Sequence, residues 1–224
     1  MEITDGIHRV EGLKGVNAYF LINNEGVILI DTGMPGNAER IITQVKSLGK
    51  GEDDITHIII THADIDHCGS AADLKKMTGA KLAIHEGDAA SICGETELKK
   101  VKGFMKVIFN TMSLFMRFVP IKPDIILQDG DEIDGLKIYH IPGHTNGSIC
   151  IYKPNKAIFT GDAIITIGKG GPRGPMGIFT LDMAQAWESI NRLNNLELEY
   201  DILLPGHGNP LTHNASLKVK ELKK

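Results

Sequence analysis

The sequence has 224 residues, 42% of them hydrophobic, and a formal net charge of -4. This length and composition predict one domain, residues 1–224, with a sizeable core, and the negative charge argues against nucleic-acid binding. The N-terminal residues MEITDGIHRV lack the apolar segment of a signal peptide, which favours a soluble, cytoplasmic protein. The three cysteines are far apart, so neither a disulfide framework nor a zinc ribbon is expected.

Short apolar segments and helical periodicities alternate along the chain. In the N-terminal half, strands are predicted at residues 16–22, 26–31, 57–61 and 81–85, and helices at 37–48 and 69–77. In the C-terminal half, strands are predicted at 136–141, 148–153, 156–161 and 200–205, with a helix at about 183–193 and a basic helix at the end. This alternation predicts an α/β chain.

Residues 99–119 stand out because they contain four of the seven phenylalanines together with several methionines. Charges at Lys102, Lys106 and Arg117 leave too short an apolar stretch for stable membrane insertion, which needs roughly 20 apolar residues. Two interpretations have equal weight: a helical insertion around 95–119 that packs on the body or forms a homodimer interface, and an apolar wall over a substrate pocket. An interfacial membrane contact is a weaker third.

Four polar motifs each follow an apolar segment predicted to be a strand. The first, THADIDHCGS at residues 61–70, places two imidazoles and two carboxylates within six residues. Side chains just past the C-terminal ends of strands project into the crevice where α/β proteins place their sites. Zinc, iron and manganese accept imidazole and carboxylate ligands. Each motif alone is typical of a turn or helix cap, but together they predict a metal site, with candidate ligands His62, Asp64, Asp66, His67, His144, Asp162 and His207.

As a set, these motifs resemble the metallo-β-lactamase superfamily, in its branch of glyoxalase II-like and lactonase-like hydrolases. The resemblance runs from about residue 17 to about residue 210. Its motifs are Gly-Val-Ile-Leu-Ile-Asp31-Thr-Gly, Thr-His62-x-x-x-Asp66-His67-x-Gly, Pro-Gly-His144-Thr-x-Gly-Ser, Gly-Asp162-Ala and Pro-Gly-His207-Gly. The resemblance implies a four-layer αββα sandwich with a binuclear metal site.

The resemblance also implies how the ligands divide between two divalent ions. His62, the residue at position 64 and His144 would hold one ion, and Asp66, His67 and His207 the other, with Asp162 bridging them. The family most often has histidine at position 64, so the chain has HxDxDH in place of HxHxDH.

The carboxylate of Asp64 would leave the site less positive than a histidine would. Zinc is the leading expectation, and a harder oxygen ligand also suits iron or manganese. Asp64 has a shorter reach than histidine, so a second arrangement stays open, in which it bonds a ligand water or His144 instead of the ion.

The implied activity is hydrolysis of an ester, thioester or lactone by a metal-bridging hydroxide, with Asp66 also shuttling a proton to the leaving group. Two alternatives stay open: a non-haem iron oxidoreductase of the sulfur dioxygenase or flavodiiron kind, favoured by Asp64, and a non-catalytic metal-binding protein. The expected partner is a small-molecule substrate. Lys169 and Arg173 would suit an anionic group, whereas the Phe/Met segment would suit an apolar one.

Three further residues receive weaker predictions. His57 and His140 flank strands and are expected to hydrogen-bond to metal ligands. Cys68 follows His67 directly, but at the start of a helix we expect it to face the core as a small apolar group rather than to bind metal.

Overall fold

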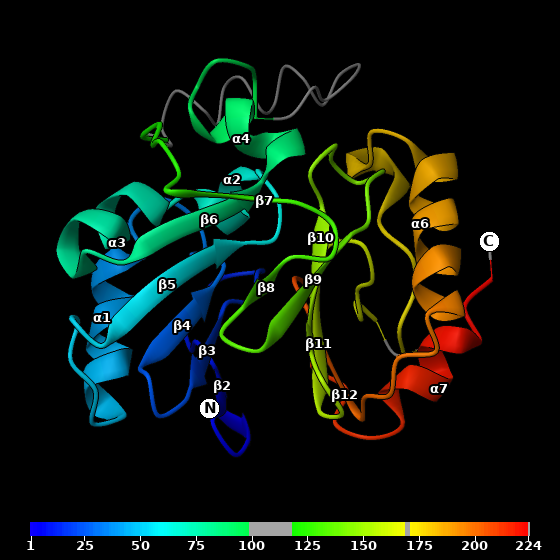
Figure 1. Cartoon of the computed structure of the whole chain (residues 1–224), viewed down its shortest axis with the longest axis horizontal. Helices are drawn as coiled ribbons and strands as arrows, with labels where there is room; N and C mark the ends of the chain where they lie inside the picture. Colours follow the sequence, from blue (N-terminus) through cyan, green and yellow to red (C-terminus); the bar gives the residue numbers. More distant parts are fainter. Residues whose placement is uncertain (99–117, 169–170, 224) are drawn as a thin grey trace. The chain divides into compact units, whose positions relative to one another are not determined.

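The computed structural model describes residues 1–98, 118–168 and 171–223. It divides into two compact units, Met1–Ile84 with Ala89–Ile126, and His85–Asp88 with Leu127–Lys224 (Figure 1). Most of the predicted helical insertion around 95–119, and with it the predicted homodimer surface, lies outside the described residues. No helix in the described ranges is long and apolar enough to cross a membrane.

In the first unit, the described residues form a seven-stranded sheet whose strands follow one another in chain order. The early strands pair antiparallel, whereas β4, β5 and β6 pair in parallel. The strands are β1 (Glu2–Thr4), β2 (Ile7–Arg9), β3 (Tyr19–Ile22), β4 (Val27–Ile30), β5 (Ile55–Ile60), β6 (Lys81–His85) and β7 (Ile125–Leu127). Because the parallel strands share a direction, the residues that follow β4 and β5 meet at one edge of the sheet.

Helices α1 (Ala38–Ser47) and α3 (Ala71–Thr78) lie along one face of this sheet (Figure 1). Ile41 and Val45 of α1 and Leu74 of α3 are fully buried in the same core cluster as Leu29 and Ile58 of the strands. The apolar residues of α1 recur every three or four positions, which places them on one side of the helix. This packing fixes the strand ends that carry the first polar motif.

In the second unit, the described residues form a five-stranded sheet. Its strands, in spatial order, are β12 (Ile202–Pro205), β11 (Ala157–Gly161), β10 (Ile149–Lys153), β9 (Leu136–His140) and β8 (Glu132–Ile133). The β11–β12 pair is parallel and the other pairs are antiparallel. The residues that follow β11 and β12 therefore lie at the same edge.

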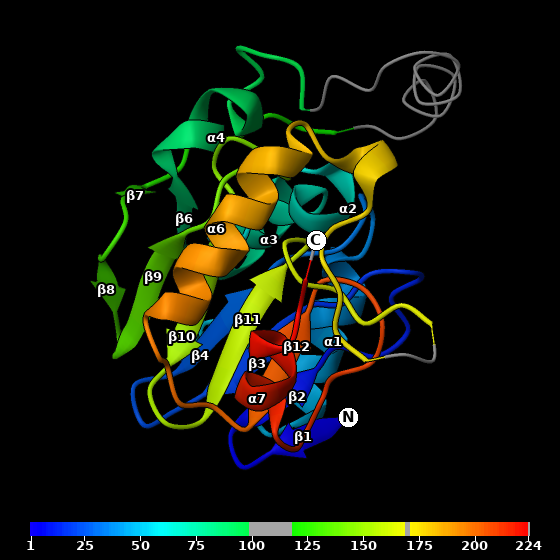
Figure 2. The ribbon, with the colours of Figure 1, turned by 90° about the vertical axis from the view of Figure 1, so that its right-hand side faces the viewer.

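Helices α6 (Met183–Asn195) and α7 (Ala215–Lys220) cover one face of the second sheet, in front of it in Figure 2. Ile190 of α6 and Val219 of α7 share a core cluster with Ile158 and Leu203. Each unit thus contains one sheet with helices over one face, which makes one layer of strands and one layer of helices. The predicted αββα sandwich consists of two such pairs of layers.

The predicted elements are found with shifted ends, and several short ones were missed. The strand expected from residue 16 begins at Tyr19. The helix expected from Gly69 is α3, which begins at Ala71, and a short helix that was not predicted, α2 (Ile65–Cys68), precedes it and ends at Gly69. A side chain at Gly69 would place its Cβ 2.4 Å from the main-chain oxygen of Ile65, so only glycine fits the junction. The missed elements are α2, β1, β2, α4 (Glu86–Ile92), β7, β8 and the 3-10 helix η1 (Gly177–Phe179).

Candidate functional site

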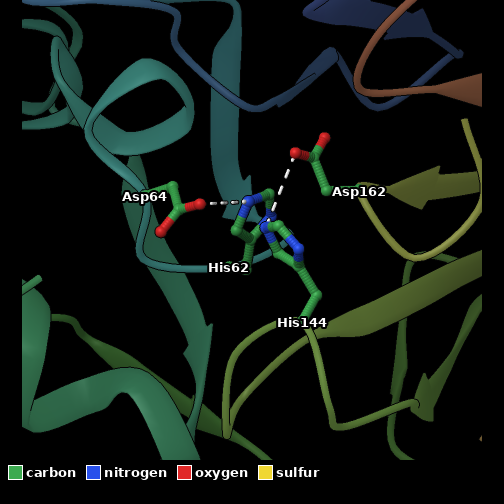
Figure 3. Close-up of side chains that lie close together, drawn as sticks. All are labelled: His62, Asp64, His144 and Asp162. Atoms are coloured by element: carbon green, nitrogen blue, oxygen red, sulfur yellow. Dashed lines mark ion pairs between the residues drawn. The ribbon is translucent and has the colours of Figure 1, made fainter. Parts of the chain in front are cut away.

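His62 and Asp64 lie between the end of β5 and the start of α2 in the first unit. The Nε2 atom of His62 is 3.5 Å from Oδ2 of Asp64, and both side chains are buried (Figure 3). Asp64 precedes α2, but its side chain makes no capping hydrogen bond to that helix. Its carboxylate is directed at the imidazole of His62 instead.

Asp66 and His67 form a second pair, in α2 of the same unit. Nε2 of His67 is 3.9 Å from Oδ2 of Asp66, and the His67 ring lies 4.1 Å from the His62 ring between centroids. The His67 side chain is fully buried, whereas the Asp66 side chain is 32% exposed. The predicted motif therefore presents two adjacent imidazole–carboxylate pairs, one of which has an accessible carboxylate.

Asp31, directly after β4, orients both imidazoles. Its carboxylate accepts hydrogen bonds from the main-chain N–H and the hydroxyl of Thr61, each at 2.8 Å, and its Oδ2 is 2.8 Å from Nδ1 of His67. Because Asp31 only accepts, Nδ1 of His67 carries the proton and its Nε2 presents a lone pair. The Thr61 hydroxyl donates to Asp31, so its oxygen accepts a hydrogen bond from Nδ1 of His62 at 3.0 Å. Nε2 of His62 therefore presents a lone pair as well.

In the second unit, one carboxylate oxygen lies between two imidazoles. Oδ2 of Asp162 is 3.5 Å from Nε2 of His144 and 3.2 Å from Nε2 of His207 (Figure 3 shows the contact with His144). Asp162 follows β11 and His207 follows β12, so the parallel pairing of these strands brings the two residues together. Imidazole nitrogen and carboxylate oxygen are both ligands that zinc accepts.

Two contacts fix the loop that carries His144. The buried carboxylate of Asp88 accepts hydrogen bonds from the Thr145 hydroxyl at 2.7 Å and from the main-chain N–H of Gly147 at 2.8 Å. The Thr180 hydroxyl donates to the carbonyl of Met176 at 2.8 Å, so it accepts from Nδ1 of His144 at 3.3 Å. His144 therefore also presents Nε2, as His62 and His67 do.

Sequence reasoning missed Asp31, Thr61, Asp88 and Thr180 as residues that position the candidate ligands. For Asp31 a signal existed, since it ends the strand beside the one that carries His62 and both strands run in the same direction. Asp88 lies in α4, a helix that was not predicted.

The weaker predictions have mixed outcomes. Cys68 is buried in the core cluster of the first unit, as predicted. Nε2 of His140 bonds the carbonyl of Asn146 at 2.8 Å, so this ring supports the main chain of the His144 loop. Nδ1 of His57 is 3.2 Å from the hydroxyl of Thr56. Lys169 lies outside the described residues.

Comparisons with known proteins identify the family of the chain. The sequence model of the metallo-β-lactamase superfamily matches residues 12–207. The chain belongs to this superfamily. It is 35% identical to the probable metallo-hydrolase MJ0888 of Methanocaldococcus jannaschii, over 86% of this chain and 87% of that protein. It is 29% identical to the hydroxyacylglutathione hydrolase GloC of Haemophilus influenzae, over 85% of this chain and 84% of that protein.

A solved structure shows the same fold. The crystal structure of TTHA1623 in a di-iron-bound form superposes with a TM-score of 0.69 at 24% identity, and the match covers 92% of this chain and 94% of that one. The predicted metallo-β-lactamase fold is therefore confirmed. Superfamily members use two divalent metals, and the chain is a metal-dependent hydrolase of this superfamily with His and Asp side chains suited to such ions.

Proposed function

We propose that the chain hydrolyses an ester, thioester or lactone of a small molecule at a binuclear metal centre. The observation that carries this proposal is the single Asp162 oxygen between His144 and His207. It is supported by the two imidazole–carboxylate pairs of the first unit and by the shared family model, which spans both units and also favours one functional domain. The proposed ligands are His62, Asp64, Asp66, His67, His144, Asp162 and His207.

The chemistry of these donors fits two divalent ions. Four neutral imidazoles and three carboxylates carry three negative charges, so two divalent ions would leave a residual charge of about +1. By the resemblance to the family, His62, Asp64 and His144 serve one ion, and Asp66, His67 and His207 the other. Three of the four imidazoles have Nδ1 held by a neighbouring oxygen, which presents Nε2 as the ligand atom.

Two bound ions would supply Lewis-acid polarisation of a substrate carbonyl and would lower the pKa of water to about 7. Asp66, with its 32% exposed side chain, is the residue that we assign to proton transfer. It accepts the proton from the attacking water and returns it to the leaving group. A carbon–oxygen bond to water forms, the bond to the leaving alcohol or thiol breaks, and the products are a carboxylic acid and that alcohol or thiol.

The thioester is the substrate bond that we favour, because GloC is a hydroxyacylglutathione hydrolase and matches most of both chains. The metal we expect is zinc, as in most sites built from imidazole and carboxylate. The additional oxygen donor of Asp64 also makes the site suitable for iron or manganese.

The test combines elemental analysis with a substrate panel. Purified protein is analysed for zinc, iron and manganese, loaded with the metal found, and assayed on an ester, a thioester, a lactone and a phosphodiester. His67→Ala should lose metal and activity while keeping its circular dichroism spectrum. His213→Ala is the matched control, because His213 is exposed and contacts Asp201 at 3.6 Å. Full turnover in metal-free His67→Ala protein would exclude this function.

A second candidate function rests on Asp64. A carboxylate next to His62 makes an oxygen-rich first site, and TTHA1623 has been solved in a di-iron-bound form. An iron-dependent oxidoreductase of the sulfur dioxygenase kind would consume oxygen with a persulfide substrate. Iron-loaded protein that consumes no oxygen in this assay and cleaves a thioester supports the hydrolase.

A further inference from the structure

Residues 176–181 form a segment, here termed the rim strap, that is fastened to the loop of His144. The main-chain N–H of Leu181 donates to the carbonyl of His144 at 3.2 Å, and that of Asp182 donates to the carbonyl of Gly143 at 2.9 Å. Together with the Thr180 hydroxyl at Nδ1 of His144, these bonds hold the strap directly beside a proposed metal ligand.

The rim strap exposes large apolar side chains. Met176 is 38% exposed, Ile178 60% and Leu181 41%. Residues 174–181, Gly-Pro-Met-Gly-Ile-Phe-Thr-Leu, contain no charged side chain. Exposed apolar residues scattered singly need no explanation, but three within six residues beside a candidate active site indicate a surface that binds an apolar group.

The strap is held in place before any ligand binds. On its N-terminal side, Arg173 exchanges two main-chain hydrogen bonds with Ile165, at 2.9 and 3.0 Å. Gly174 packs so closely on Trp187 that an added Cβ would lie 2.8 Å from the indole ring. Within the strap, the N–H of Phe179 and the hydroxyl of Thr180 both donate to the carbonyl of Met176. A surface fixed in this way loses little conformational entropy on binding.

We propose that the rim strap binds the apolar acyl chain of the substrate, with Ile178 as its most exposed contact. This inference rests on the proposed hydrolase function and names the substrate class for the same site. A charge-free strap fits an aliphatic acyl group and offers no charged side chain to an anionic one. The apolar wall predicted at residues 99–119 lies almost entirely outside the described residues, and the rim strap is a separate apolar surface.

The test uses metal-loaded protein and the p-nitrophenyl esters of acetate, butyrate and octanoate. In the wild type, kcat/KM should rise with acyl length. In Ile178→Ser, the octanoate-to-acetate ratio of kcat/KM should fall about tenfold, as expected for losing part of one buried isoleucine contact. Leu217→Ser is the matched control, because Leu217 on α7 has the same 60% exposure. It should leave the ratio unchanged.

A second measurement separates this inference from the proposed function. Calorimetry measures the binding of octanoate and of acetate to the same metal-loaded proteins. If no ester, thioester or lactone is hydrolysed but Ile178→Ser still weakens octanoate binding selectively, the hydrolase proposal fails and the acyl site stands. If Ile178→Ser and Leu217→Ser behave alike in both measurements, the rim strap does not bind the acyl chain. If the molecular mass measured by sedimentation changes in Ile178→Ser alone, the rim strap forms a contact between copies of the chain, and the inference is overturned.

Discussion

Nδ1 of His67 lies 2.8 Å from a carboxylate oxygen of Asp31, and both side chains are almost completely buried. Asp31 adopts a left-handed backbone conformation, with φ of 59°, directly after β4. Asparagine tolerates this conformation better than other residues with a side chain, so Asp31→Asn changes the charge of the carboxylate with little cost to the backbone.

We expect Asp31→Asn to weaken metal binding by about 10- to 100-fold, the usual effect of losing a group that orients a ligand. The carboxylate accepts from Thr61 at one oxygen and from Thr61 and His67 at the other, whereas an amide has only one accepting oxygen, so the tautomer of His67 is held less firmly. Competition with a chromogenic chelator measures the affinity. Asp53→Asn, at an exposed position, is the control. Unchanged affinity in Asp31→Asn would show that Asp31 does not orient the ligand.

Asp88 and Thr145 should be energetically coupled. A hydrogen bond to a charged group contributes about 1.5–3 kcal/mol, and the Thr145 hydroxyl bonds the buried carboxylate of Asp88 at 2.7 Å. Asp88→Ala and Thr145→Val should each lower the free energy of unfolding, and the double variant should lose less than the sum. Metal stoichiometry should fall in both, because the same loop carries His144. Strict additivity in urea unfolding would contradict the coupling.

Asp64→His should shift metal content toward zinc. The change removes one negative charge and replaces a hard oxygen donor with nitrogen beside His62. Elemental analysis of protein grown in medium with equal zinc, iron and manganese measures the effect, and Glu25→Gln, exposed and far along the chain, is the control. If the metal content of Asp64→His matches that of the wild type, Asp64 is not a ligand.

His85 should make the apoprotein less stable in weak acid. Burial, together with the charge of His140 stacked at 3.9 Å, lowers the pKa of His85 below its ordinary value of 6.5. Its Nδ1 also accepts a hydrogen bond from Gly87, which protonation would break. The unfolded chain therefore takes up this proton first, so the contribution is complete above pH 6.5 and is lost as the pH falls below that value.

The measurement for His85 is urea unfolding of chelator-treated protein between pH 8 and pH 5. Wild-type stability should decline more steeply below pH 6.5 than that of His85→Asn, because the variant lacks the titrating ring. Equal slopes in the two proteins would mean that His85 does not titrate differently in the folded and unfolded states.

The motifs that carry the proposed ligands could be found in the sequence because each follows an apolar segment predicted to be a strand. Val27–Ile30 and Ile202–Pro205 are apolar throughout, and their length and flanking turns identify them as strands. The residues after the parallel pairs β4–β5 and β11–β12 lie at shared sheet edges, whereas the division of the proposed ligands between two ions rests on the resemblance to the family.

The positioning residues could not be predicted because their role depends on contacts between distant segments. Asp88 is buried in α4, where Gly87 lowers the helical propensity. Gly87 is required there, since a Cβ would lie 2.5 Å from the carbonyl of Asn146. Strands β1 and β2 show mixed burial, so they have no clear alternation for sequence analysis to detect. The exposure of Ile178 likewise depends on the fold.

The central claim is that all seven proposed ligands serve one binuclear hydrolytic centre. The most direct test measures bound metal per chain in the wild type and in Asp162→Ala, together with thioester hydrolysis by the same samples. We predict about two ions in the wild type, fewer in Asp162→Ala, and loss of turnover in step with the metal, because this carboxylate lies between His144 and His207. Unchanged metal content and full hydrolysis in Asp162→Ala would contradict the account.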